Sequence, residues 1–233
     1  MEKIIFHKET KTFHLYNEEI SYIMCVLENG HMGQLYYGKR IHDKPDFSYL
    51  VEKCGRPMTS YIFEGDRSFS LEHIRQEYPV YGTTDYRHPA IEIMQENGSN
   101  ISEFKYVGYE ILKGKPSLKG LPATYTESEE EAETLKIILK DDLTGAKLIL
   151  LYTIFSKGSA IARSAYICNE GEKVLHLQTM MSLNLDLPDK DYVWMQLSGA
   201  WSRERYVKNR ILEQGITAID SMRGNSSHEH NPF

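Results

Sequence analysis

The stretch KVLHLQTMMSLNLDLP, from Lys173 to Pro188, is the clearest case in this chain of a sequence pattern with a period of two. Its odd-numbered positions from 175 to 187 carry five leucines, one threonine and one methionine, and its even-numbered positions are mainly polar. Such a period places successive side chains on opposite faces of a β-strand. We therefore expect residues 174–187 to form one of the longest strands, with the leucine face buried and the other face wetter.

Strand-like runs continue on both sides of this stretch. Upstream, ARSAYICNEGEKVL contains two such runs divided by Asn-Glu-Gly, a turn signal that is typical of a hairpin. Similar runs are SYIMCVLENG with QLYYGKR, AIEIMQENGS with ISEFKYVGYEIL, and TLKIILKDDLTGAKLILLYTIF with its Leu-Thr-Gly turn. Strands follow strands without the spacing of βαβ units. This order predicts an all-β protein, an antiparallel β-sandwich with long strands.

Helical signals are few, and one long span has little alternation. SLEHIRQEY is long enough for two helical turns, and the charge run ESEEEAE predicts a solvated loop or a single turn. Residues 39–89 hold four of the eight prolines and predict long irregular loops over the β scaffold, where binding residues often lie. No internal repeat or low-complexity linker marks a boundary, so we expect one domain over residues 1–233.

The composition excludes several classes of partner. The chain has 233 residues with 27 Lys and Arg against 33 Asp and Glu, which gives a formal net charge of −6. No basic block marks a surface for nucleic acid or anionic membranes, and no apolar run has the length of a signal peptide or a membrane span. Cys25, Cys54 and Cys168 are scattered and odd in number, which favours free thiols over a disulfide framework. We expect a cytoplasmic protein that binds neither nucleic acid nor membrane.

Familiar motifs for nucleotides, nucleophiles and metals are missing or incomplete. GKPSLKG lacks the spacing of a phosphate-binding loop, and the chain has no G-x-S-x-G elbow. His228 and His230 flank Glu229, and on a strand the two imidazoles would share one face and could bind a metal together. No third ligand is suggested nearby. We therefore expect no metal site and no cofactor.

Trp201, in the run LSGAWSRER, allows two interpretations. An indole that follows Gly-Ala just beyond a strand can project from a loop, where its face packs on the C–H groups of a pyranose ring. It can also fill the core of the sandwich, which is the more frequent situation for tryptophan. The residues alone favour the core, and only further information can reverse that preference.

Six runs distributed along the chain resemble the amino-terminal part of the bacterial α-galactosidases of glycoside hydrolase family 36. In chain order they are NGHMGQLYYGK, DRSFSLEHIRQEYPVYGTTDYRHPAIEI, GLPATY, EAETLKIIL, GAWSRERYV and RGNSSHEHNPF. The resemblance covers almost the whole chain and implies a β-supersandwich, in agreement with the period of two.

The resemblance also implies where catalysis takes place. In this family the sandwich is followed by a (β/α)₈ barrel that carries both catalytic aspartates, and no metal or nucleotide is needed. We therefore expect a fragment that ends before the last strands of its sandwich and contains no catalytic residue. The implied reaction of the parent protein is retaining hydrolysis of terminal α-galactosides such as melibiose and raffinose-type oligosaccharides.

Two substrate contacts are implied by the same resemblance. The bacterial enzymes assemble as tetramers in which amino-terminal domains help to form the wall of a neighbouring active site, and Trp201 matches the tryptophan implicated there. Glu52 is the nearest match to the family's acidic contact in the loop after the first strands. Lys53 and Cys54 depart from the family pattern of an acidic residue followed by Arg and then Ala-Phe.

Two alternatives stay open. A β-sandwich with aromatic loops can be a noncatalytic carbohydrate-binding module, which a binding titration with galactosides would reveal. A mutarotase-like enzyme would need a histidine and a carboxylate together on a concave sheet. His176 is the only histidine that we expect near the centre of a strand, and a solvent-facing role is the simpler interpretation of it.

Overall fold

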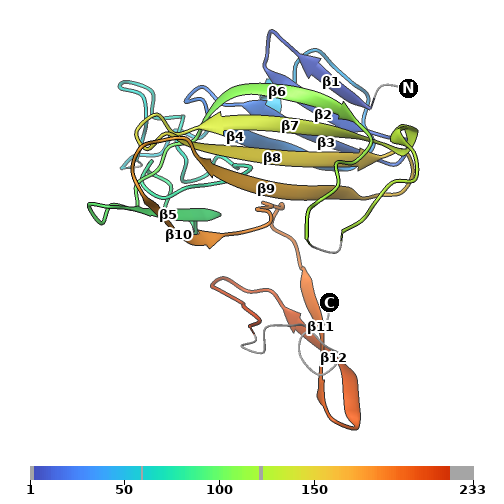
Figure 1. Cartoon of the computed structure of the whole chain (residues 1–233). Coiled ribbons are helices and arrows are strands. Elements are labelled where there is room, and N and C mark those ends of the chain that lie inside the picture. Colours follow the sequence, from blue (N-terminus) through green and yellow to red (C-terminus); the bar gives the residue numbers. More distant parts are fainter. Residues whose placement is uncertain (1–2, 59, 121–122, 221–233) are drawn as a thin grey trace. The chain divides into compact units, whose positions relative to one another are not determined.

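The structure of this chain is a computed structural model that describes residues 3–58, 60–120 and 123–220 (Figure 1). The chain divides into two compact units, Met1–Asp186 and Leu187–Phe233. Within the described residues the regular structure consists of antiparallel strands and two single turns of 3-10 helix. The predicted all-β class is confirmed, and the expectation of one supersandwich domain over 1–233 stays a prediction.

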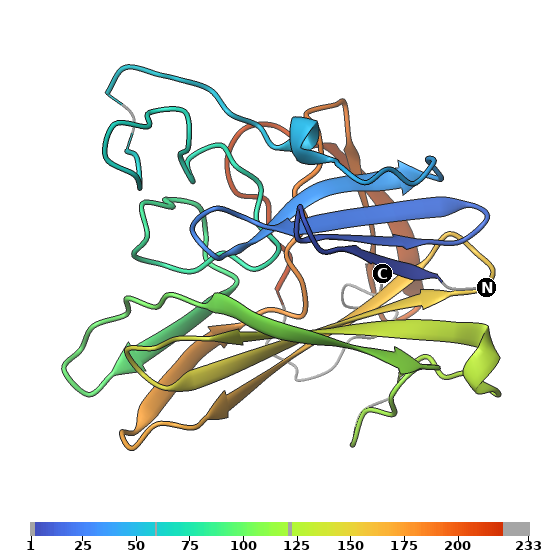
Figure 2. The same ribbon diagram turned by 90° about the horizontal axis from the view of Figure 1, so that it is seen from above.

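The first unit is built around two four-stranded antiparallel sheets. One sheet has the order β1 (Ile4–His7), β2 (Thr12–Tyr16), β3 (Ile20–Val26) and β4 (Met32–Lys39). The other has the order β6 (Lys105–Lys113), β7 (Ala132–Lys140), β8 (Ala146–Phe155) and β9 (Ile161–Asn169). Figure 2 shows the two sheets as stacked layers, blue above and green to orange below. This is the arrangement of a β-sandwich.

Shorter elements complete both units. In the first unit, β5 (Ile91–Gln95) pairs with β10 (Leu175–Met180), and the 3-10 turns are η1 (Ser48–Leu50) and η2 (Glu129–Glu131). In the described part of the second unit, residues 187–220, β11 (Val193–Ala200) and β12 (Arg203–Ile211) form a hairpin. Within the ESEEEAE run, Glu129–Glu131 form the predicted single turn, whereas Ala132 and Glu133 begin β7; residues 39–89 are mainly irregular as expected. No helix in the described ranges is long and apolar enough to cross a membrane.

The core lies between the two large sheets and follows from the alternation of their strands. Phe13 and Leu15 on β2 and Ile137 and Leu148 on β7 and β8 are fully buried in one cluster. Each buried side chain of this size contributes roughly 1.5–3 kcal/mol through removal of apolar surface from water. On β7 and β8, the apolar side chains of the alternating pattern therefore face the core, as the pattern predicts.

The opening stretch behaves differently from its prediction. Only Leu175–Met180 forms a strand, which at 6 residues is shorter than the 10 residues of β8. Beyond it, Leu183 and Leu187 are 46% and 45% exposed, whereas Asn184 and Asp186 bond to other parts of the first unit. The alternation therefore persists, but the polar side faces the protein. The expectation of a long strand with a buried leucine face is wrong.

The hairpin that Asn-Glu-Gly predicted is also not formed. The Asn169-Glu170-Gly171 turn exists, but β9 pairs with β8 and β10 pairs with β5, so the flanking strands belong to different sheets. Gly171 is required there because a Cβ would lie 2.1 Å from the carbonyl oxygen of Thr144. In line with the few helical signals, SLEHIRQEY forms turns and an isolated bridge of Gln76 with Gly33, beside which the Gln34 N–H donates to the Arg75 carbonyl.

Candidate functional site

The tip of the β11–β12 hairpin presents the tryptophan that the sequence singled out. Ala200 pairs with Arg203, so Trp201 and Ser202 form the turn between them. The Trp201 side chain is 84% exposed. The Ser202 backbone N–H donates to Glu204 Oε1 at 2.8 Å, which stiffens the tip. Trp201 therefore projects from a loop, and the core-filling interpretation is wrong.

The Gly-Ala-Trp sequence has a local structural reason. The pairing of β11 with β12 shifts register between Ser198 and Ala200. A Cβ on Gly199 would lie 2.4 Å from the carbonyl oxygen of Arg203, a distance that only glycine allows. This register shift tightens the end of the hairpin, so that the Trp201 side chain points outward from the turn.

Glu52, the second predicted contact, lies in the long loop of the first unit. It is exposed, and none of the described residues bonds to its carboxylate. Its neighbour Lys53 forms an ion pair with Glu28, and the Cys54 N–H donates to the Ser68 carbonyl at 3.3 Å. Glu52 and Trp201 belong to different units, each of which is described separately.

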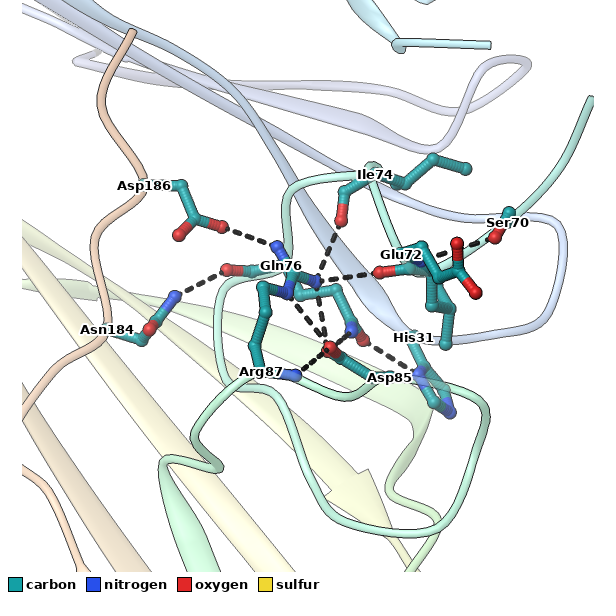
Figure 3. A network of polar contacts seen from close by, with 10 residues as sticks. His31, Ser70, Glu72, Ile74, Gln76, Asp85, Arg87, Asn184 and Asp186 are labelled. Atoms are coloured by element: carbon teal, nitrogen blue, oxygen red, sulfur yellow. Dashed lines mark hydrogen bonds and ion pairs between the residues drawn. The ribbon is translucent and has the colours of Figure 1, made fainter. Parts of the chain in front are cut away.

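A partly buried polar network supports the part of this loop that follows Glu52 (Figure 3). We call it the Arg87 network. Asp85 accepts from Gln76 Nε2 at 2.6 Å and from Arg87 Nη2 at 2.9 Å. Arg87 Nη1 reaches Asp186 at 3.0 Å, and Gln76 bonds to His31 Nδ1 at 2.9 Å. Together these bonds tie the loop to His31, just before β4, and to the end of the first unit.

The electrostatics of the Arg87 network follow from its burial. Burial acts to lower the pKa of Arg87, but its hydrogen bonds and ion pair with Asp85 outweigh this effect and raise the pKa. Burial lowers the pKa of His31 despite its bond to Gln76. The guanidinium is therefore permanently charged, and the imidazole is neutral near pH 7.

A second network lies deeper, between the two sheets. Glu77 is completely buried and accepts hydrogen bonds from the hydroxyls of Tyr22 at 2.7 Å and Tyr152 at 2.8 Å. Arg163 forms an ion pair with Glu77 at 3.0 Å and donates to the Asn184 carbonyl at 2.7 Å. Burial raises the pKa of the Glu77 carboxyl, and Arg163 and the two phenols oppose that rise.

The buried acids of the two networks, Glu77 and Asp85, cannot reach a substrate because they are enclosed, and the partly exposed Asp186 is paired with Arg87. Glu77 and Asp85 are 0% and 2% exposed and have their oxygens occupied by protein donors. Sequence reasoning missed both networks, although Glu77, Asp85 and Arg87 all stand in the second of the six family-like runs. Through these bonds, Glu77, Asp85 and Arg87 hold the irregular loop in one conformation.

Among the described residues, the remaining candidates of the sequence form no site. His176 lies exposed on β10 opposite Met94, as its solvent-facing interpretation predicts. No group of three or more His, Cys, Asp or Glu in the part of the chain that the structure describes could hold a metal ion. The His228, Glu229 and His230 run lies outside the described residues. Cys25 is buried, and Cys54 and Cys168 are exposed free thiols.

The sequence of this chain is similar to those of known α-galactosidases. The α-galactosidase AgaA of Geobacillus stearothermophilus is 42% identical over 99% of this chain, which spans 31% of that relative. Mel36A of Lactobacillus acidophilus is 36% identical, again over 99% of this chain and 31% of the relative. This chain therefore corresponds to about a third of the relatives' length.

Solved structures agree in fold as well as in sequence. The α-galactosidase from Lactobacillus brevis superimposes with a TM-score of 0.93 at 38% identity, over 98% of this chain and 31% of that one. A variant of AgaA in complex with raffinose gives a TM-score of 0.89 at 43% identity, over 95% of this chain and 31% of that one. Residues 30–233 match the glycosyl hydrolase family 36 N-terminal domain. The chain belongs to glycoside hydrolase family 36, in which it forms the N-terminal domain.

Proposed function

We propose that this chain is the N-terminal domain of an α-galactosidase that hydrolyses terminal α-galactosides such as melibiose and raffinose-type oligosaccharides. The names of the relatives support this activity, and structures of AgaA variants contain raffinose and stachyose. A retaining glycosidase needs two carboxyl groups about 5 Å apart across the sugar. The family resemblance puts that pair outside the third of the relatives that this chain spans, so the chain alone should leave α-galactosides intact.

Within the parent enzyme, the proposed task of this domain is to complete the substrate wall. The observation that carries the proposal is the Trp201 indole, 84% exposed at a hairpin tip that Gly199 and Glu204 shape. An exposed rigid indole offers a flat apolar face for the C–H groups of a galactose ring. The exposed carboxylate of Glu52 is the proposed second contact, as an acceptor for sugar hydroxyls. A homo-oligomeric, cytoplasmic parent enzyme is part of the same proposal.

The substitution Trp201→Ala in the intact enzyme tests this role. We expect kcat/KM for raffinose to fall by about 1–3 kcal/mol in transition-state stabilisation, which is roughly 5- to 150-fold. Trp201→Phe should recover part of the loss because it keeps an aromatic face. Tyr125, 78% exposed in the first unit, provides the matched control, and Tyr125→Ala should leave kcat/KM unchanged.

The outcomes separate the remaining alternatives. Unchanged kinetics in Trp201→Ala would reject the substrate wall. Tight binding of galactosides to the 233-residue chain by itself, measured by calorimetric titration, would favour a noncatalytic carbohydrate-binding module. The mutarotase-like alternative has lost its support, because the family match and the solitary exposed His176 both speak against it.

A further inference from the structure

Four side chains in the first sheet and in the segment after it form a continuous hydrogen-bonded chain, which we call the Asp43 clasp. It comprises His7, His14, Ser21 and Asp43. Asp43 Oδ1 accepts from His7 Nε2 at 3.0 Å and from His14 Nδ1 at 2.7 Å. His14 Nε2 lies 2.9 Å from Ser21 Oγ, and the Ile41 N–H donates to the same Oγ at 3.1 Å.

The partners of His14 define its protonation. A carboxylate only accepts, so Nδ1 carries the proton that faces Asp43. Nε2 of the neutral ring then accepts the Ser21 hydroxyl proton, which leaves the Ser21 oxygen free to accept from Ile41. Burial lowers the pKa of His14, and the hydrogen bond to Asp43 opposes this effect only in part. Every proton of the clasp therefore has an acceptor near neutral pH.

The atoms of Ser21, His14 and Asp43 follow the order of a hydrolytic triad, but their surroundings exclude that chemistry. Ser21 and His14 are completely buried, so no substrate could reach the hydroxyl. The clasp consequently acts by holding structure in place.

The structure held by the clasp is the segment that leaves β4. His7, His14 and Ser21 come from β1, β2 and β3, so three strands hold the backbone and side chain of residues 41–43. Phe47 continues the attachment, since it is fully buried and its ring packs edge-on to His14 at 5.5 Å between centroids.

This anchored segment leads directly to Glu52. The Leu50 N–H donates to the Phe47 carbonyl at 2.9 Å, and the Val51 N–H donates to the Ser48 carbonyl at 3.0 Å. On the C-terminal side of Glu52, the Cys54 N–H donates to the Ser68 carbonyl. Glu52 thus projects from a short stretch that is fixed at both ends.

We propose that Asp43 is a positioning residue for Glu52, which it orients through the clasp and the turn at η1. The inference rests on the proposed function, because it gives Glu52 a fixed place in the substrate wall. Loss of Asp43 would free the start of the loop without touching the substrate itself.

Hydrogen exchange on the 233-residue chain tests the anchor. In Asp43→Ala we expect the backbone amides of Leu50, Val51 and Cys54 to exchange about tenfold faster, because local opening becomes easier. Asp142 is an exposed aspartate in the β7–β8 turn, and Asp142→Ala should leave these amides unchanged. If Asp43→Ala does not fold, His7→Ala removes only one of the two bonds to Asp43 and should give a smaller increase. Unchanged exchange in folded variants would overturn the clasp.

Kinetics of the intact enzyme test the link to substrate. Asp43→Ala should raise KM for raffinose by no more than Glu52→Gln does, and the double variant should show no further increase. A raised KM in Glu52→Gln alone, with faster exchange but normal KM in Asp43→Ala, would overturn the positioning role. A normal KM in both variants would reject Glu52 as a contact, while the exchange data would still decide whether the clasp anchors the loop.

Discussion

The two units of this chain differ in how they use their apolar side chains. In the first unit the strands of two sheets enclose a core in which Leu148 and Ile137 have no exposed surface. In the second unit one face of the β11–β12 hairpin is apolar and exposed, with Met195 at 67% and Ile211 at 70%. A two-stranded hairpin has no opposing layer of its own and is marginally stable in water. The first unit therefore provides the folding stability, whereas the second unit mainly presents exposed side chains.

The same contrast holds for the polar side chains. Glu77, Asp85 and Arg163 of the first unit are enclosed and fully bonded, so they act as part of the fold. In the second unit the bond from Arg210 to Gln196 at 3.1 Å links the strands across the hairpin, and Trp201 is left free at the tip. Substitutions should consequently affect stability in one unit and binding in the other.

The largest effect should come from the Glu77 network. Glu77→Gln removes the charge that compensates the buried Arg163 and leaves the guanidinium without an ionic partner. We expect a loss of about 3–5 kcal/mol in the free energy of unfolding. Denaturant titration followed by circular dichroism measures it, with the exposed Glu129→Gln as a neutral control. A loss no larger than that of the control would mean that Glu77 is not ionised in the folded chain.

A smaller effect should follow from Asp85→Asn in the Arg87 network. The new amide group would point a donor at Gln76 Nε2 or at Arg87, both of which are donors already. We expect a loss of about 1–3 kcal/mol, the typical cost of an unsatisfied buried polar group. A lower midpoint in urea with an unchanged m-value would identify a pure stability effect. Asp142→Asn serves as the exposed control, and an equal response of both variants would contradict the network's role.

The contrast between units also explains what the sequence could predict. Alternation and turn residues correctly predicted the β3–β4 and β7–β8 hairpins, because each depends on neighbours along the chain. The residues alone favoured a buried Trp201, because a tryptophan more often fills a core than projects from a loop, and the structure shows it exposed. Only the family resemblance favoured the loop.

The errors arose where distant residues decide the outcome. Residues 183–187 alternate as a strand should, yet their polar side chains bond to the loop at Gln76 and Arg87, and none of the strands in the described ranges pairs with them. Neither partner could be identified from a local period of two. The Asp43 clasp was missed for the same reason, because it joins side chains from four segments.

The smallest stability effect should be found on the exposed face of the hairpin. Val207 pairs with Leu197 and is 57% exposed, so Val207→Ala removes little surface that folding of the chain had buried. We expect a change within about 0.5 kcal/mol. In the first unit, Ile137→Val deletes a single methylene and should nevertheless cost about 0.5–1.5 kcal/mol, because the space that it leaves lies in a packed core. Both variants can be compared by urea unfolding of the same 233-residue chain. If Val207→Ala costs more than Ile137→Val, this face of the hairpin is covered when the chain folds in solution, and the division between a stable unit and a surface unit is wrong.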